Sequence, residues 1–146
     1  MPAHYWPADP KLRALTDSFL EYYQQSFRPA VIAPLEYRLD KVFREKPFDE
    51  ESWTDSLPVV YAELDVFEVL LKRYDGRFVV CDEPTIADLQ LFFEFQSMEY
   101  NRFEWKMQYP RIKQWYNDML TLPNVKTIVD EWMPVKTELA RTIDDI

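Results

Sequence analysis

The chain has 146 residues, of which 47% are apolar and 16% aromatic, and its formal net charge is −9. This length is typical of one domain, and the apolar content excludes disorder. The negative charge argues against nucleic acid as a partner, because phosphate backbones attract cationic surfaces. There is no secretory signal and no apolar run near the roughly 20 residues that cross a bilayer, so we expect a cytoplasmic protein that does not bind membranes.

Glycine occurs once, at Gly76. Sheet proteins need glycines for hairpin turns and bulges, so this scarcity favours helices. We therefore predict an all-α fold with one domain over residues 1–146, a single bundle of about five to six helices around a buried central helix. The single Cys81 is interpreted as a small buried apolar residue, and His4 as a surface residue. One Cys and one His exclude the usual zinc sites, and we expect no bound metal.

The first helix is predicted to begin at Asp9, a good N-cap residue that follows the linker-like residues 1–8. Apolar side chains then recur at steps of three and four as far as Phe27, which places them on one face of a helix. Proline removes a backbone donor and crowds the preceding turn. We therefore expect Pro29 and Pro34 to bend or interrupt the chain before a helical pattern resumes.

Residues 46–56 are charged, polar and aperiodic, and we predict a loop there rather than a linker between domains. Residues 57–74 carry the clearest helical period in the chain. Gly76 follows this helix and is placed for a left-handed C-terminal residue.

Thr85 and Asp88 stand just before a strongly apolar run that ends at Phe95. This spacing is that of a capping box, in which the threonine accepts from the N–H three residues on and the acid reaches back to the N-cap N–H. A helix that is apolar almost all round belongs at the centre of a bundle, where water cannot satisfy orphaned donors. We interpret the pair as structural, and we identify no catalytic residue.

Two more helices are predicted after this one, beginning at Pro110 and Pro123. The short helix after Pro123 is predicted to bury one apolar face, made of Val125, Ile128, Val129 and Trp132. Pro134 is expected to interrupt this helix, and residues 134–146 to form a terminal helix.

Three segments of the chain combine motifs that one known family also combines. They are TIADLQLFFEF, the later stretch YPRIKQWYNDMLTLPNVKTIVDE, and the start HYWPADPKLRALTDSFLEYYQQSFRP. Together they resemble the C-terminal all-helical domain of cytosolic glutathione transferases, and the start is similar to theta-class enzymes. In that family a Ser/Thr-x-x-Asp box caps the central helix, a Tyr-Pro pair opens the next, and a Pro-x-Val element begins the one after. The resemblance covers about residues 4–133.

The resemblance implies an enzyme with a second, N-terminal thioredoxin-like domain that binds glutathione and activates its thiol. We find no βαβ unit in this sequence and expect that domain to be absent, so we leave open whether the chain is an enzyme. No cofactor is expected, and glutathione would be a co-substrate only beside a thioredoxin-like domain. By the resemblance, the walls of a hydrophobic substrate pocket would include Tyr23, Phe27, Met98 and Trp105. An aromatic stripe at helical spacing is, however, more often core than pocket.

Two functions remain open. The first is a glutathione transferase-like protein, whose helical domain shapes the hydrophobic electrophile site and a dimer interface in the conjugation of glutathione. The alternative is a non-catalytic protein–protein assembly module, as similar domains are in translation-factor and synthetase complexes. The expected partners are a thioredoxin-like domain or partner protein, a second copy of the chain, and a hydrophobic small molecule.

Overall fold

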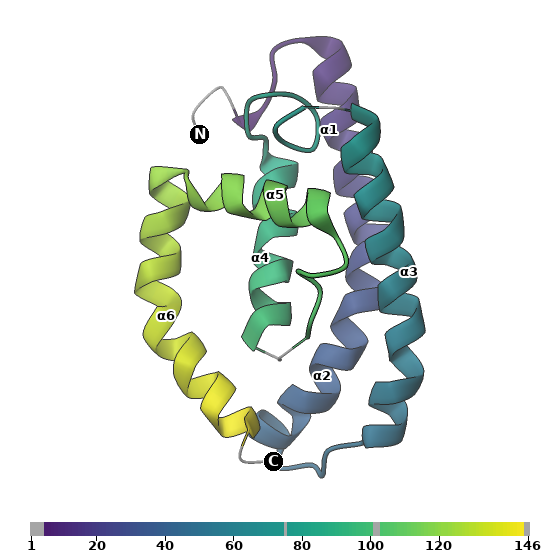
Figure 1. Cartoon of the computed structure of the whole chain (residues 1–146), viewed down its shortest axis with the longest axis vertical. Coiled ribbons are helices and arrows are strands. Elements are labelled where there is room, and N and C mark those ends of the chain that lie inside the picture. Colours follow the sequence, from purple (N-terminus) through teal and green to yellow (C-terminus); the bar gives the residue numbers. More distant parts are fainter. Residues whose placement is uncertain (1–4, 75, 101–102, 145–146) are drawn as a thin grey trace.

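The computed structural model describes residues 5–74, 76–100 and 103–144, so the prediction for His4 lies outside the described residues. Within these ranges the chain forms helices and no strand: α1 (Pro10–Tyr22), a π-helical turn (Tyr23–Phe27), α2 (Arg28–Arg44), α3 (Glu50–Tyr74), α4 (Ile86–Tyr100), α5 (Pro110–Leu120) and α6 (Pro123–Asp144). The predicted all-α fold is confirmed. Figure 1 shows α4 in the middle of the molecule, with α2 and α3 on one side of it and α6 on the other. Helix α5 crosses in front of α4 in this view.

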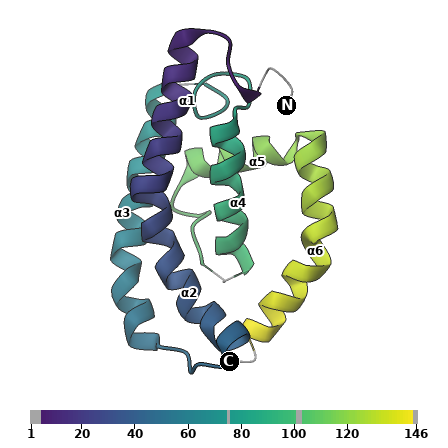
Figure 2. The same ribbon diagram turned by 180° about the vertical axis from the view of Figure 1, so that it is seen from behind.

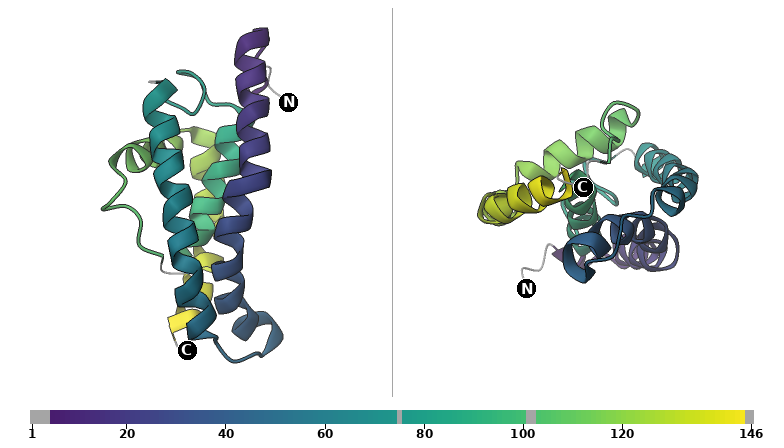
Figure 3. Two further views of the ribbon diagram at one scale, coloured as in Figure 1. Left: turned by 90° about the vertical axis from the view of Figure 1, so that its right-hand side faces the viewer. Right: turned by 90° about the horizontal axis from the view of Figure 1, so that it is seen from below.

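The first two helices form one long rod. Asp9 caps its start, since its Oδ1 accepts the backbone N–H groups of Lys11 at 2.9 Å and Leu12 at 3.0 Å. The rod continues through the π turn into α2, where Pro29 stands near the start and Pro34 in the interior. The helix is therefore not interrupted at these two prolines, but it does bend, since α2 leans away from the line of α1 (Figure 1). Figure 3 shows this rod alongside α3.

The π turn gives a physical reason for the continuity. The N–H of Arg28 bonds to the carbonyl of Tyr23, five residues back instead of four. This wider pattern falls just before Pro29, which brings no N–H and crowds the turn before it. The backbone thus accommodates the proline without leaving the helix.

The third helix begins earlier than predicted. Residues 50–56 belong to α3, so the loop expected over residues 46–56 is wrong beyond Asp49. The Asp49 carboxylate accepts the backbone N–H of Ser52 at 3.0 Å and its hydroxyl at 2.7 Å. An aspartate in this position satisfies the free donors of a first helical turn, which explains why a polar, aperiodic segment is helical.

Helix α4 is the buried central helix that the sequence predicts. Its Phe95 ring contacts rings from three other parts of the fold, with centroids 5.6 Å from Phe27, 5.7 Å from Phe67 and 5.5 Å from Trp115. Such aromatic contacts add to the stabilisation from area burial. Figure 2 shows α4 from behind, between the α1–α2 rod and α6.

Helix α5 is held in place from α3. The buried Glu68 carboxylate accepts the backbone N–H groups of Arg111 at 3.1 Å and Ile112 at 2.9 Å, two donors in the first turn of α5 that have no partner within the helix. This side chain fixes the start of α5 and thereby the position of Trp115 and Tyr116, which pack against α4.

The loop between α3 and α4 differs from expectation in two details. Gly76 does not adopt a left-handed conformation. An added Cβ at this position would lie 2.9 Å from the backbone carbon and oxygen of Cys81, so the glycine is needed for close backbone approach instead. Cys81 is only half-buried, and its thiol lies 3.4 Å from the carbonyl oxygen of Glu83. The interpretation of Cys81 as a buried residue is therefore wrong.

Helix α6 runs unbroken from Pro123 to Asp144, so the expected interruption at Pro134 and the separate terminal helix over residues 134–146 are wrong. Pro134 is exposed, and water can bind the carbonyl that lacks its usual partner. Val125 and Val129 are buried as predicted, but Ile128 and Trp132 are 42% and 52% exposed.

Candidate functional site

The Thr85–Asp88 pair lies at the start of α4, and both residues are fully buried. Asp88 Oδ2 accepts the Thr85 backbone N–H at 2.8 Å and the Thr85 hydroxyl at 2.9 Å. Its Oδ1 accepts the Val79 N–H and the Trp115 indole N–H, both at 2.9 Å. The threonine hydroxyl thus donates to the carboxylate, whereas a capping box would have it accept from the backbone.

The surroundings of Asp88 indicate a structural rather than a catalytic carboxyl group. Burial raises the pKa of its carboxyl, and the hydrogen bonds from Thr85, Val79 and Trp115 act in the opposite direction. Four donors occupy the two carboxylate oxygens, and these donors come from the preceding loop, the N-cap and α5. The group ties three segments together through these four hydrogen bonds.

The four side chains expected to form pocket walls lie in the interior of the chain: Tyr23, Phe27, Met98 and Trp105. The Phe27 and Trp105 rings belong to one aromatic cluster, since both contact Phe95, with ring centroids 5.6 Å and 4.8 Å from it. Within this chain they act as packing residues, and their role as substrate walls stays a prediction.

Tyr23 is part of a polar triad at the π turn. Its hydroxyl donates to the buried Glu94 carboxylate, and Arg28 donates to the Tyr23 oxygen at 3.0 Å and forms an ion pair with Glu94. Burial raises the pKa of Tyr23, and the hydrogen bond to Glu94 raises it further. The phenol therefore stays protonated, with its proton directed at Glu94.

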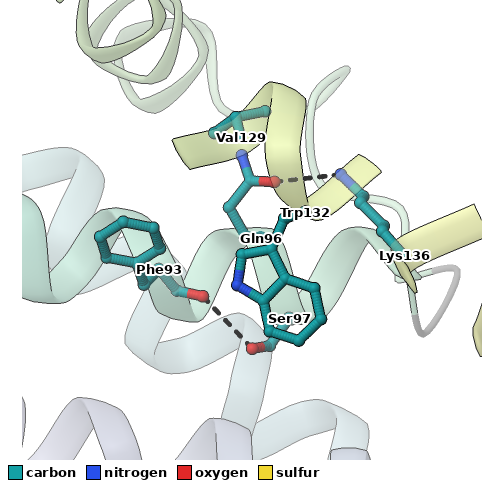
Figure 4. Close-up of a pocket in the computed structure, with 6 residues that line it drawn as sticks. All are labelled: Phe93, Gln96, Ser97, Val129, Trp132 and Lys136. Carbon is teal, nitrogen blue, oxygen red and sulfur yellow. Dashed lines mark hydrogen bonds between the residues drawn. The ribbon is translucent and has the colours of Figure 1, made fainter. Parts of the chain in front are cut away.

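A groove with a mainly apolar lining lies between α4 and α6. Its volume is about 290 Å³, and six residues line it: Phe93, Gln96, Ser97, Val129, Trp132 and Lys136. Figure 4 shows these side chains of α4 and α6 around the groove, with the Lys136 side chain directed toward the Gln96 amide. Sequence reasoning missed this groove because it assigned Trp132 to a buried face of α6.

A charged cluster adjoins this groove. Glu99 pairs through Oε1 with Lys106 and through Oε2 with Lys136. Burial alone would raise the pKa of the Glu99 carboxyl, but hydrogen bonds from the two lysines outweigh it and hold the pKa below its ordinary value. Gln96 bridges the cluster to α5, since its amide donates to the Tyr116 hydroxyl at 2.5 Å. Burial raises the pKa of Tyr116, and Glu99 adds to the effect.

A family model described as the glutathione S-transferase C-terminal domain matches residues 37–130. The chain belongs to this family. The match includes α3, α4 and α5 entire, and with them the buried Thr85–Asp88 pair. A search of curated protein sequences finds no match.

Solved glutathione transferases share the fold. Human glutathione S-transferase T1-1 in its apo form superposes with a TM-score of 0.79 at 16% identity, over 100% of this chain and 59% of that one. A delta-class enzyme from Nilaparvata lugens superposes with a TM-score of 0.75 at 19% identity, over 98% of this chain and 63% of that one. A diazinon-metabolizing enzyme from the silkworm Bombyx mori superposes with a TM-score of 0.71 at 24% identity, over 98% of this chain and 60% of that one. The chain thus spans about three fifths of each of these proteins.

The described residues of this glutathione transferase-like protein show no group of three or more His, Cys, Asp or Glu side chains that could hold a metal ion. A search of the same residues for a helix with the length and apolarity of a transmembrane span finds none.

Proposed function

We propose that this chain acts as the helical half of a glutathione transferase. In this role α4 and α6 supply the apolar wall that receives an electrophilic co-substrate, and a thioredoxin-like domain or partner protein supplies glutathione. The observation that carries the proposal is the α4–α6 groove, in which two aromatic rings and a valine surround a few polar groups. Small-molecule sites typically combine an apolar lining with a few polar groups that orient the ligand.

Activation of the thiol is assigned to the partner domain. A thiolate needs a preorganised donor close to its sulfur. Tyr23 has a buried hydroxyl of the type that can act as such a donor, but its proton is engaged by Glu94 and its pKa is raised. We therefore propose that the chain shapes the substrate site and leaves the proton chemistry to the glutathione-binding domain.

The proposal is tested by ligand binding to the purified chain. Calorimetric titration with a neutral aromatic probe, 1-naphthaleneacetamide, is expected to show binding that Trp132→Ala weakens roughly tenfold, because the indole supplies much of the apolar contact. Trp6→Ala is the matched control, since Trp6 is 40% exposed and Trp132 is 52% exposed, and Trp6 does not line the groove. Equal affinities of the two variants would contradict the assignment.

A non-catalytic assembly module is the second candidate, and one observation favours it. Val59, Val66 and Val69 are all about half-exposed on α3, at spacings that place them near one face of the helix. Exposed apolar side chains gathered on one face are typical of protein–protein contacts. An assembly module needs no ligand in the α4–α6 groove, so the same titration separates the two functions.

A further inference from the structure

The α4–α6 groove carries one charged side chain among its described lining residues, Lys136. This residue lies one helical turn after Trp132, and its side chain is only 19% exposed. Its ammonium group therefore stands at the edge of an apolar surface and partly out of water. A charge in such a position interacts more strongly with a ligand than a fully solvated lysine does.

The cluster that holds Lys136 has one positive charge in excess. The Glu99 carboxylate pairs with both Lys106 and Lys136. One carboxylate balances one ammonium group, so the three side chains together carry a net charge of about +1 when all are ionised. The lowered pKa of Glu99 keeps its carboxylate ionised at neutral pH. Glu104 and the Lys126–Asp130 ion pair line the cavities beside the cluster, so the excess belongs to these three side chains and is centred on the two lysines.

Lys136 also retains hydrogen-bonding capacity. An ammonium group has three N–H donors. In the described part of the chain, one donates to Glu99 Oε2 and another to Gln96 Oε1 at 3.1 Å. These two contacts hold the nitrogen at the groove, as Figure 4 shows for the bond to Gln96, and leave one donor for a ligand oxygen.

We propose that the groove selects apolar ligands that carry an anionic group, with the aromatic body against Trp132 and Phe93 and a carboxylate at Lys136. The inference rests on the proposed function and names the ligand class for the same site. A volume of about 290 Å³ suits a small bicyclic acid. A second cavity of about 430 Å³ shares Gln96, Val129 and Lys136 with the groove, so the acid end of a ligand has room beside the lysine.

The test compares 1-naphthaleneacetate with its neutral analogue, 1-naphthaleneacetamide, by calorimetric titration at low salt. The acid is expected to bind about tenfold more tightly, as one hydrogen bond to a charged group allows. Lys136→Met removes the charge and keeps the apolar stem, so it should weaken binding of the acid about tenfold and bring it close to that of the amide. Glu99→Gln raises the excess charge and should tighten binding of the acid only.

Lys113→Met is the control, because it makes the same change in net charge on the exposed surface of α5. The opposite effects expected for Lys136→Met and Glu99→Gln cannot both arise from loss of fold, and circular dichroism checks each variant. Equal binding of acid and amide, or an equal effect of Lys113→Met, would overturn the inference while leaving the apolar groove in place. Binding of neither probe would overturn the proposed function as well.

Discussion

At the scale of single residues, Asp88 is a buried polar group that connects three segments of the interior. Its carboxylate accepts four hydrogen bonds of 2.8–2.9 Å, from Val79, from Thr85 twice and from Trp115. None of these donors can reach water when the acceptor is removed, because Thr85 and Asp88 are fully buried and Trp115 is 0% exposed. A buried donor that loses its acceptor lowers the stability of the folded state, because in the unfolded chain the same donor binds water.

Asp88→Ala is therefore expected to lower the free energy of unfolding by about 2–4 kcal/mol, more than loss of an ordinary helix cap. For a domain of this size the melting temperature should fall by on the order of 10 °C. Differential scanning calorimetry measures the change, with Asp17→Ala on the exposed face of α1 as the control. A variant that melts within a degree or two of the parent would show that the network contributes little.

The local part of this network could be predicted from the sequence, and the rest could not. Thr85 and Asp88 are three residues apart, so their spacing alone indicates that the side chain can reach the backbone at the helix start. Trp115 lies 27 residues further along the chain, and its indole reaches Asp88 only through the packing of α5 on α4. The hydrogen bond from Val79 depends likewise on the path of the preceding loop.

At the scale of elements, proline gave the least reliable sequence signal. Pro34 and Pro134 stand inside helices that continue past them, although each removes one backbone hydrogen bond. The local penalty is real, but burial of the helix faces in the bundle outweighs it, and the π turn relieves the crowding at Pro29. Hydrophobic periodicity did not predict the start of α3, because it does not detect a helix cap such as Asp49.

The cost of an interior proline in α6 can be measured. Pro134→Ala restores the missing backbone donor and is expected to raise the melting temperature by a few degrees. Pro123→Ala is the matched control in the same helix, because a proline in the first position lacks only a donor that has no intrahelical partner. Thermal unfolding followed by circular dichroism distinguishes the two. A lower melting temperature for Pro134→Ala would show that the proline suits its place in α6.

At the scale of the whole molecule, the fold follows from sequence patterns but the groove does not. Glycine scarcity and the apolar run in α4 predict a helical bundle with a buried centre. The groove depends on how α6 is set against α4, and this long-range geometry leaves Ile128 and Trp132 exposed although their spacing is that of a core face.

The most direct test of the account is to map where an apolar ligand binds the chain. In heteronuclear NMR spectra of the ¹⁵N-labelled protein, titration with 1-naphthaleneacetamide is expected to shift amide signals along one side of α4 and the facing part of α6, with the Trp132 indole among the largest changes. Signals from α3 should stay in place. Shifts confined to α3 or to the α1–α2 rod, or no shifts at all, would contradict the claim that α4 and α6 form the ligand site.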